Sequence, residues 1–142
     1  MSDPKVPTPN AGDRIILPNR RRSEARKITW RPPHNVDAPE TTIHVTIGYA
    51  DDGLRPVEIF YDAGYRSGSD RATEIADLCI TFSVFIQHEG VTIDSLMRSL
   101  AQEKDARSGS MEFGSTVGLL LDQLNTPPAW AEEVSKHTGV SQ

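Results

Sequence analysis

The stretch TIHVTIGYADDGLRPVEIFYD, residues 42–62, decides the fold expected for this chain. Apolar and polar residues alternate over 43–49, and a period of two is typical of a half-buried strand. Residues 51–53, Asp-Asp-Gly, are a turn signal. The alternation resumes over 57–62, with Pro56 near the start of the run, where a missing donor is tolerated. The two runs predict an antiparallel β-hairpin.

Helices are expected after the hairpin. Apolar residues at three- and four-residue spacing predict a long helix from Ser69 or Asp70 to about residue 88 or 89, with Gly90 as its stop. Thr92 is a good cap for a second helix. These helices would cover one face of the sheet, so the expected class is α+β, a small antiparallel sheet packed by three to four helices.

The end of the chain carries weaker signals. Ser115 is expected to cap a third helix that ends at the two prolines of 127–128, after a polar loop over 104–110. A short fourth helix fits 128–136, with Trp130 docked on the body. We therefore expect the C-terminal part, 127–142, to be a short helix and tail.

The N-terminal part is basic and rich in proline. We expect residues 1–27 to form a flexible basic arm and residues 28–126 to form the domain, with a short third strand at Thr29 and Trp30. A sheet of two or three strands leaves open edges. We therefore expect a homo-oligomer, most simply a dimer, formed through the sheet or the long helix.

Composition limits the function classes. A chain of 142 residues has room for one domain. Its single cysteine rules out an internal disulfide and a cysteine-based zinc cage. There is no apolar run of membrane-spanning length and no secretory signal, so we expect a cytoplasmic protein without membrane contact. The net charge of −5 hides a basic start, where residues 1–31 hold eight Lys or Arg against three Asp or Glu.

Side chains that commonly carry catalysis show no catalytic pattern here. Cys79 lies on the apolar stripe of the long helix, so we interpret it as a buried and inert thiol rather than a nucleophile. The four histidines have no metal-ligand spacing, and the adjacent acids are expected to be solvated. We therefore expect no catalytic residue, metal or cofactor in this chain alone.

The loop that opens the long helix is a candidate anion site. Glycine, serine and arginine meet there, and a helix N-terminus attracts negative charge. The alternative is an ordinary strand-to-helix turn, because the lysine of a phosphate-binding loop is missing. The candidate anion- or nucleotide-binding residues are Arg66, Ser67, Gly68, Ser69 and Arg71.

The basic arm is a second candidate contact. It could bind phosphates, but a stacking platform is poorly supported. We therefore favour a solvated arm that docks on the acidic body of the chain or on a partner over an arm that binds nucleic acid. The candidate contact residues are Arg20, Arg21, Arg22, Arg26 and Lys27.

An ordered set of short motifs resembles a known family. The motifs are 17–22 (LPNRRR), 52–62 (DGLRPVEIFYD), 67–69 (SGS), 85–91 (FIQHEGV) and 93–96 (IDSL). Together they resemble the TSCPD domain near the C-terminus of adenosylcobalamin-dependent ribonucleotide reductases. The resemblance spans roughly residues 17–103. The cysteine motif and the cobalamin-binding barrel of that family have no counterpart here, so none of its redox residues is carried over.

The resemblance implies a non-catalytic accessory or regulatory module in nucleotide reduction, with a reductase or another protein of nucleotide metabolism as its partner. The alternative is a domain that binds the phosphate of a nucleotide or nucleic acid through residues 64–71 and the arm. Two further hypotheses are a homo-oligomeric scaffold and an enzyme whose site is completed by a second chain.

Overall fold

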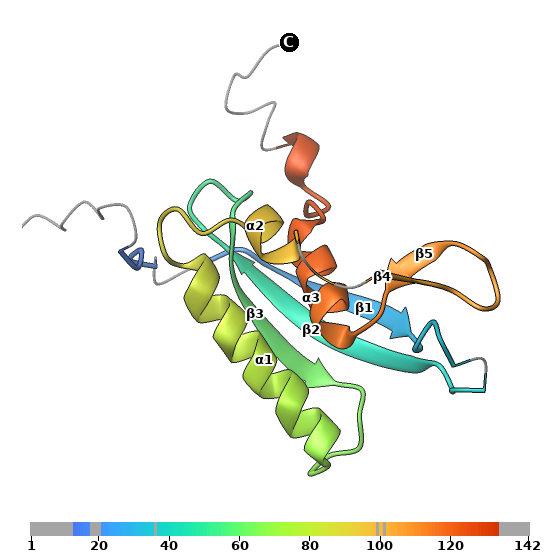
Figure 1. The fold of residues 1–142 in the computed structure, drawn as a ribbon. Coiled ribbons are helices and arrows are strands. Elements are labelled where there is room, and N and C mark those ends of the chain that lie inside the picture. Colours follow the sequence, from blue (N-terminus) through green and yellow to red (C-terminus); the bar gives the residue numbers. More distant parts are fainter. Residues whose placement is uncertain (1–12, 18–20, 36, 99, 101, 134–142) are drawn as a thin grey trace, which may run out of the picture.

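The structure, a computed structural model, describes residues 13–17, 21–35, 37–98, 100 and 102–133 (Figure 1). A helical turn at 131–133 follows the named elements, and the rest of the expected fourth helix lies outside the described residues. The elements follow one another as β1 (Ser23–Trp30), β2 (Thr41–Tyr49), β3 (Pro56–Ala63), α1 (Asp70–Ile86), α2 (Ile93–Met97), β4 (Gln102–Lys104), β5 (Met111–Phe113) and α3 (Thr116–Asn125).

The predicted hairpin is the centre of the sheet. Strands β1, β2 and β3 form an antiparallel sheet in that order, and Ile47 of β2 lies opposite Ile59 of β3. On its other side, Ile43 of β2 lies opposite Ile28 of β1. The α+β class predicted from the sequence is confirmed.

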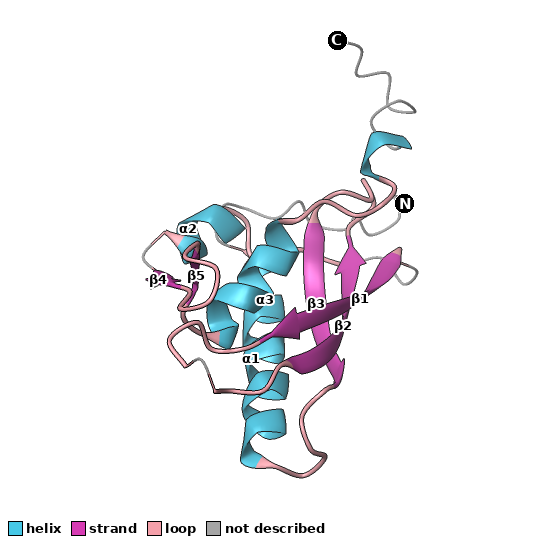
Figure 2. Ribbon diagram, turned by 90° about the vertical axis from the view of Figure 1, so that its right-hand side faces the viewer, coloured by secondary structure: helices cyan, strands magenta, loops and turns pink. Residues whose placement is uncertain are grey.

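One face of the sheet carries the core. Figure 2 shows α1 and α3 on the same side of the three strands. The inward-facing residues of the strands meet the apolar stripes of the two helices there. The residues at the centre of this core are no more than 1% exposed. The core includes Ile43, Val45, Ile47, Ile59, Ile75, Cys79, Leu120 and Leu121.

Capping residues set the helix starts as predicted. Ser69 caps α1, and its Oγ accepts the Ala72 N–H at 3.2 Å. Thr92 caps α2, accepting the Ser95 N–H at 3.1 Å. Ser115 is the N-cap residue of α3, but its side chain makes no capping hydrogen bond. Within the described residues, no helix has the length and apolar character needed to cross a bilayer.

Strand β1 is longer than predicted. It begins at Ser23, so residues 23–27 of the expected flexible arm belong to the sheet, and the expected short strand at Thr29 and Trp30 is only its end. The apolar alternation is missing because two positions on the inner face are held by Glu24 and Arg26, which bind polar groups rather than the core.

The predicted polar loop over 104–110 is confirmed at 105–110, but it is the turn of a small hairpin that was not predicted. Strands β4 and β5 pair antiparallel on either side of a turn, with Glu103 opposite Glu112. The turn is built by Asp105, whose carboxylate accepts the N–H groups of Arg107 and Ser108 at 2.8 and 2.9 Å. These hydrogen bonds lower the pKa of Asp105.

Candidate functional site

The predicted loop at the start of α1 is a tight turn. Gly68 has a φ of 78°, a conformation that favours glycine, and the Ser69 N–H donates to the Arg66 carbonyl at 3.0 Å. Ser69 uses its side chain as the helix cap. Ser67 and Gly68 therefore shape the turn, and the Arg66 side chain is exposed to solvent.

Arg71 is the loop residue with a defined environment. Its guanidinium lies 5.9 Å from the ring centroid of Trp30 and 5.2 Å from that of Tyr65, both within the range of a cation–π contact. The hydroxyl of Tyr65 is buried without a hydrogen-bond partner. No described residue accepts a hydrogen bond from Arg71. Arg71 is exposed, and its guanidinium lies over the two rings with its N–H donors available.

Arg71 lines an open hollow of about 300 Å³, together with Trp30, Pro32, His34 and residues 114–116. We call this the Arg71 hollow. Residues 114–116 are the start of α3, where the Ser115 side chain leaves the first N–H groups without a cap. The hollow thus brings together a cation, an aromatic ring and the positive end of a ten-residue helix.

The predicted basic arm does not form one basic surface. Successive residues of a strand point to opposite faces, so the charges separate. Arg21 forms a two-point ion pair with Glu58, at 2.9 and 3.1 Å. Arg22 lies over the ring of Trp130, 5.0 Å from its centroid. Lys27 is exposed on the outer face, and Arg20 lies outside the described residues.

Arg26 of the predicted arm has a structural role. Its guanidinium donates to the carbonyl oxygens of Gln123 and Thr126 at the C-terminal end of α3, and to the Tyr49 hydroxyl at 2.9 Å. A cation at this end of a helix is favourable. The side chain is only 10% exposed, so Arg26 is not available to an outside partner.

Glu24 completes this arrangement. Its Oε1 accepts from Arg26 Nε at 2.7 Å, and its Oε2 accepts from the Ala129 N–H at 2.8 Å. Burial acts to raise the pKa of Glu24, but the Ala129 N–H and the Arg26 guanidinium outweigh it, so the pKa is lowered from 4.5. Glu24 and Arg26 together tie β1 to α3 and the segment that follows it.

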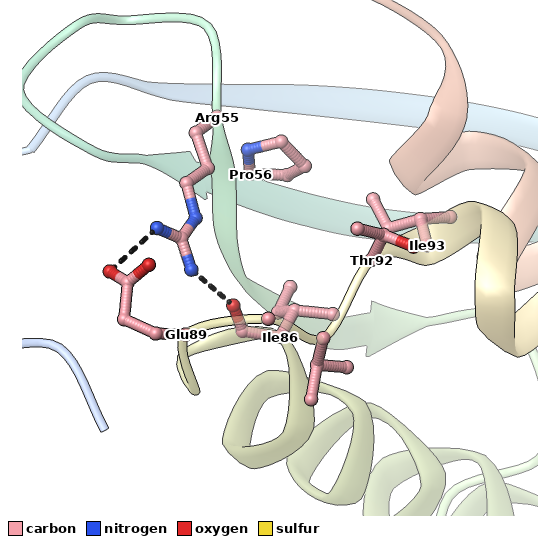
Figure 3. A pocket seen from close by; sticks show the side chains of 8 residues that line it. Arg55, Pro56, Ile86, Glu89, Thr92 and Ile93 are labelled. Carbon is pink, nitrogen blue, oxygen red and sulfur yellow. Dashed lines mark hydrogen bonds and ion pairs between the residues drawn. The ribbon is translucent and has the colours of Figure 1, made fainter. Parts of the chain in front are cut away.

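A second hollow, of about 310 Å³, lies beside the end of α1 (Figure 3). The arginine of this hollow, Arg55, already has hydrogen-bond partners within the chain. Arg55 donates to the Ile86 carbonyl at 3.1 Å and to Glu89 at 3.2 Å, so it caps the C-terminal end of α1. Several residues that carry the family resemblance meet here, namely Arg55, Ile86, Glu89 and Ile93.

Groups that could carry catalysis do not gather at either hollow. Cys79 is buried, as predicted, and burial raises the pKa of its thiol to about 12. Among the described residues, no three His, Cys, Asp or Glu side chains come close enough together to hold a metal ion. A protonated, buried thiol is a poor nucleophile.

The sequence reasoning missed most of the Arg71 hollow. It proposed Arg71, but not Trp30 or the start of α3, which come from distant parts of the chain. The expected helix cap at Ser115 was the signal that could have pointed to this part of the hollow, because any helix N-terminus can attract an anion. Its position beside Arg71 follows only from the fold.

A scan against protein-family models, a search of curated proteins and a search of solved structures found no match to this chain.

Proposed function

We propose that this chain is a non-catalytic binding module of nucleotide metabolism, and that it holds the phosphate group of its ligand at the Arg71 hollow. The observation that supports this most strongly is the state of the Arg71 guanidinium. It is exposed and lies over two aromatic rings, and its N–H donors have no acceptor among the described residues.

Three other arginines of the fold differ from Arg71 in that their donors are bonded within the chain. Arg21, Arg26 and Arg55 each donate to a carboxylate or a backbone carbonyl, so their role is to hold elements together. Arg71 has no such internal task. A guanidinium that is already oriented loses less entropy when it binds an anion.

The chemistry of the hollow favours phosphate. A guanidinium forms two parallel hydrogen bonds with a phosphate, and the free N–H groups at the start of α3 can supply more. A volume of about 300 Å³ lies at the small end of the range for ligand sites. The hollow therefore suits the phosphate portion of a ligand that extends into solvent.

The resemblance to TSCPD domains supplies the class of ligand. Such domains belong to ribonucleotide reductases, so a nucleotide is the phosphate compound that this resemblance supports. An accessory role beside a reductase is part of the same proposal, since a module that holds a nucleotide could report its level to the enzyme.

The test is a calorimetric titration with inorganic phosphate, ATP and dATP. We expect Arg71→Ala to weaken binding about ten- to a hundredfold, because a hydrogen-bonded pair of charges is worth about 1.5–3 kcal/mol. Arg66→Ala is the matched control, since it removes an exposed arginine of the same loop that does not line the hollow. Equal affinities of the wild type and Arg71→Ala would refute the proposed site.

A further inference from the structure

Thr116, the first residue of α3, brings an unpaired hydroxyl to the Arg71 hollow. The residue is only 7% exposed, and its hydroxyl makes no hydrogen bond with any described residue. The hydroxyl is nevertheless not sealed from solvent, as the hydroxyl of Tyr65 is. Because Thr116 lines the hollow, its hydroxyl opens into it. A polar side chain this deeply buried normally has a partner within the protein, so this hydroxyl is a donor available to a ligand.

We propose that the ligand of the Arg71 hollow is a phosphomonoester with a single phosphate group, and that Thr116 binds one of its terminal oxygens. This inference rests on the proposed phosphate site and narrows the ligand, among nucleotides, to nucleoside monophosphates. A phosphomonoester has three terminal oxygens. The Arg71 guanidinium can bind two of them through parallel hydrogen bonds, and the Thr116 hydroxyl can donate to the third.

The number of oxygens distinguishes this ligand from other anions. A phosphodiester has two terminal oxygens, and so has a carboxylate. When the guanidinium binds both of these oxygens, neither anion has a further one for Thr116. The hydroxyl therefore contributes most to the binding of a phosphomonoester.

The charge of the hollow matches one phosphate group. Arg71 supplies a full positive charge, and the start of α3 adds about half a charge. His34 also lines the hollow and adds to this charge when it is protonated. None of the described residues that line the hollow is a carboxylate. A phosphomonoester carries about 1.5–2 negative charges at pH 7, so one such group is close to neutralised here.

Further phosphate groups would meet negative charge beside the hollow. Trp30 also lines a neighbouring hollow of about 190 Å³, where the charged lining residues are Arg31, Glu40, Asp105 and Glu112. Arg31 pairs with Glu40 at 3.5 Å, so the other two carboxylates leave this neighbour negative. A chain of phosphates that extended past Trp30 would therefore be repelled.

The start of α1 carries the same sign of charge. Asp70 precedes Arg71 directly, and Glu74 follows it by three residues, one turn along the helix. Both carboxylates are exposed. A second or third phosphate group that extended along α1 would approach them, so the surroundings favour a ligand with one phosphate.

A series of adenine nucleotides tests the class of ligand, in calorimetric titrations of the full chain near pH 7. We expect the affinity to fall from AMP through ADP to ATP, by about tenfold overall, because each added phosphate meets like charge. Cyclic AMP, whose phosphate is a diester, should bind about tenfold more weakly than AMP. Binding of ATP or of cyclic AMP as tightly as AMP would overturn the inference.

The variant Thr116→Val tests the hydroxyl, since valine keeps the shape of the side chain and the hydroxyl has no partner to lose among the described residues. We expect about tenfold weaker binding of AMP and unchanged binding of cyclic AMP. Thr81→Val, at an exposed position of α1, is the control and should change neither. Unchanged AMP binding in Thr116→Val, with binding lost in Arg71→Ala, would refute this inference and leave the phosphate site standing. A wild type that binds no phosphate compound would refute the proposed function itself.

Discussion

The two edges of the sheet are treated in opposite ways. At β3, the helix α1 covers the edge, and the Ser83 hydroxyl accepts from the Ile59 N–H and lies within hydrogen-bond distance of the Ile59 carbonyl. At β1, the outward backbone groups have no such partner among the described residues, and the strand is held only through β2 and its inner face. One edge is covered by the chain itself, and the other is open among the described residues.

The difference shows where polar residues contribute to the fold. Ser83 and Gln87 lie on the buried stripe of α1, 8% and 3% exposed, because the backbone of β3 needs partners there. Glu24 and Arg26 are polar on the inner face of β1 because the end of α3 needs partners. Ser83 and Gln87 satisfy backbone groups that would otherwise be buried without a hydrogen bond, whereas Glu24 and Arg26 bind backbone groups at the more exposed end of α3.

The largest effect is expected at the covered edge. Ser83→Ala leaves the Ile59 N–H buried without a partner, so it should lower the free energy of unfolding by about 2 kcal/mol. The measurement is urea unfolding, followed by circular dichroism. Amide hydrogen exchange should also become faster at Ile59.

Thr81→Ala is the matched control for this variant. Thr81 makes the same bond to the carbonyl four residues earlier that Ser83 makes within α1, but it faces solvent. Its replacement should change stability by less than about 0.5 kcal/mol. Equal losses in the two variants would mean that Ser83 acts through α1 alone and not through the edge of β3.

The sequence predicted those parts of the fold whose apolar pattern is regular. The strands at residues 42–49 and 57–62 and the helix from Ser69 follow from periodicity and capping, which are local signals. Strand β1 was mostly assigned to the arm because Glu24 and Arg26 replace apolar residues on its inner face. Their partners, Ala129 and the end of α3, are about 100 residues away in the chain, so no local pattern could show this role.

The candidate site was predictable to a similar extent. Arg71 followed from its place at the start of a helix, but Arg66, Ser67, Gly68 and Ser69 were proposed with it on the same grounds. The turn uses the Ser69 side chain and the Gly68 backbone for conformation. Which arginine of a loop faces a hollow depends on tertiary packing.

A smaller effect is expected where the inner face of β1 is tied down. Glu24→Gln removes the charge that pairs with Arg26, and it should lower the free energy of unfolding by about 1 kcal/mol at pH 7. The pKa of Glu24 is lower in the folded protein than its ordinary value of 4.5. The stabilisation by its charge is therefore complete above pH 4.5 and is lost as the pH falls through the folded-state pKa.

The difference between wild type and Glu24→Gln should accordingly narrow below pH 4.5, in urea unfolding measured over a series of pH values. Glu132→Gln, at an exposed glutamate, controls for the change in net charge. A difference that stays constant down to pH 2 would show that the Glu24 charge does not hold β1 to the segment after α3.

The smallest effect is expected at the open edge. Lys27→Ala changes an exposed side chain without a partner among the described residues, so the free energy of unfolding should shift by no more than about 0.5 kcal/mol. Urea unfolding at low protein concentration measures this shift. The contrast with Ser83→Ala then separates an edge that the chain needs from one that it does not.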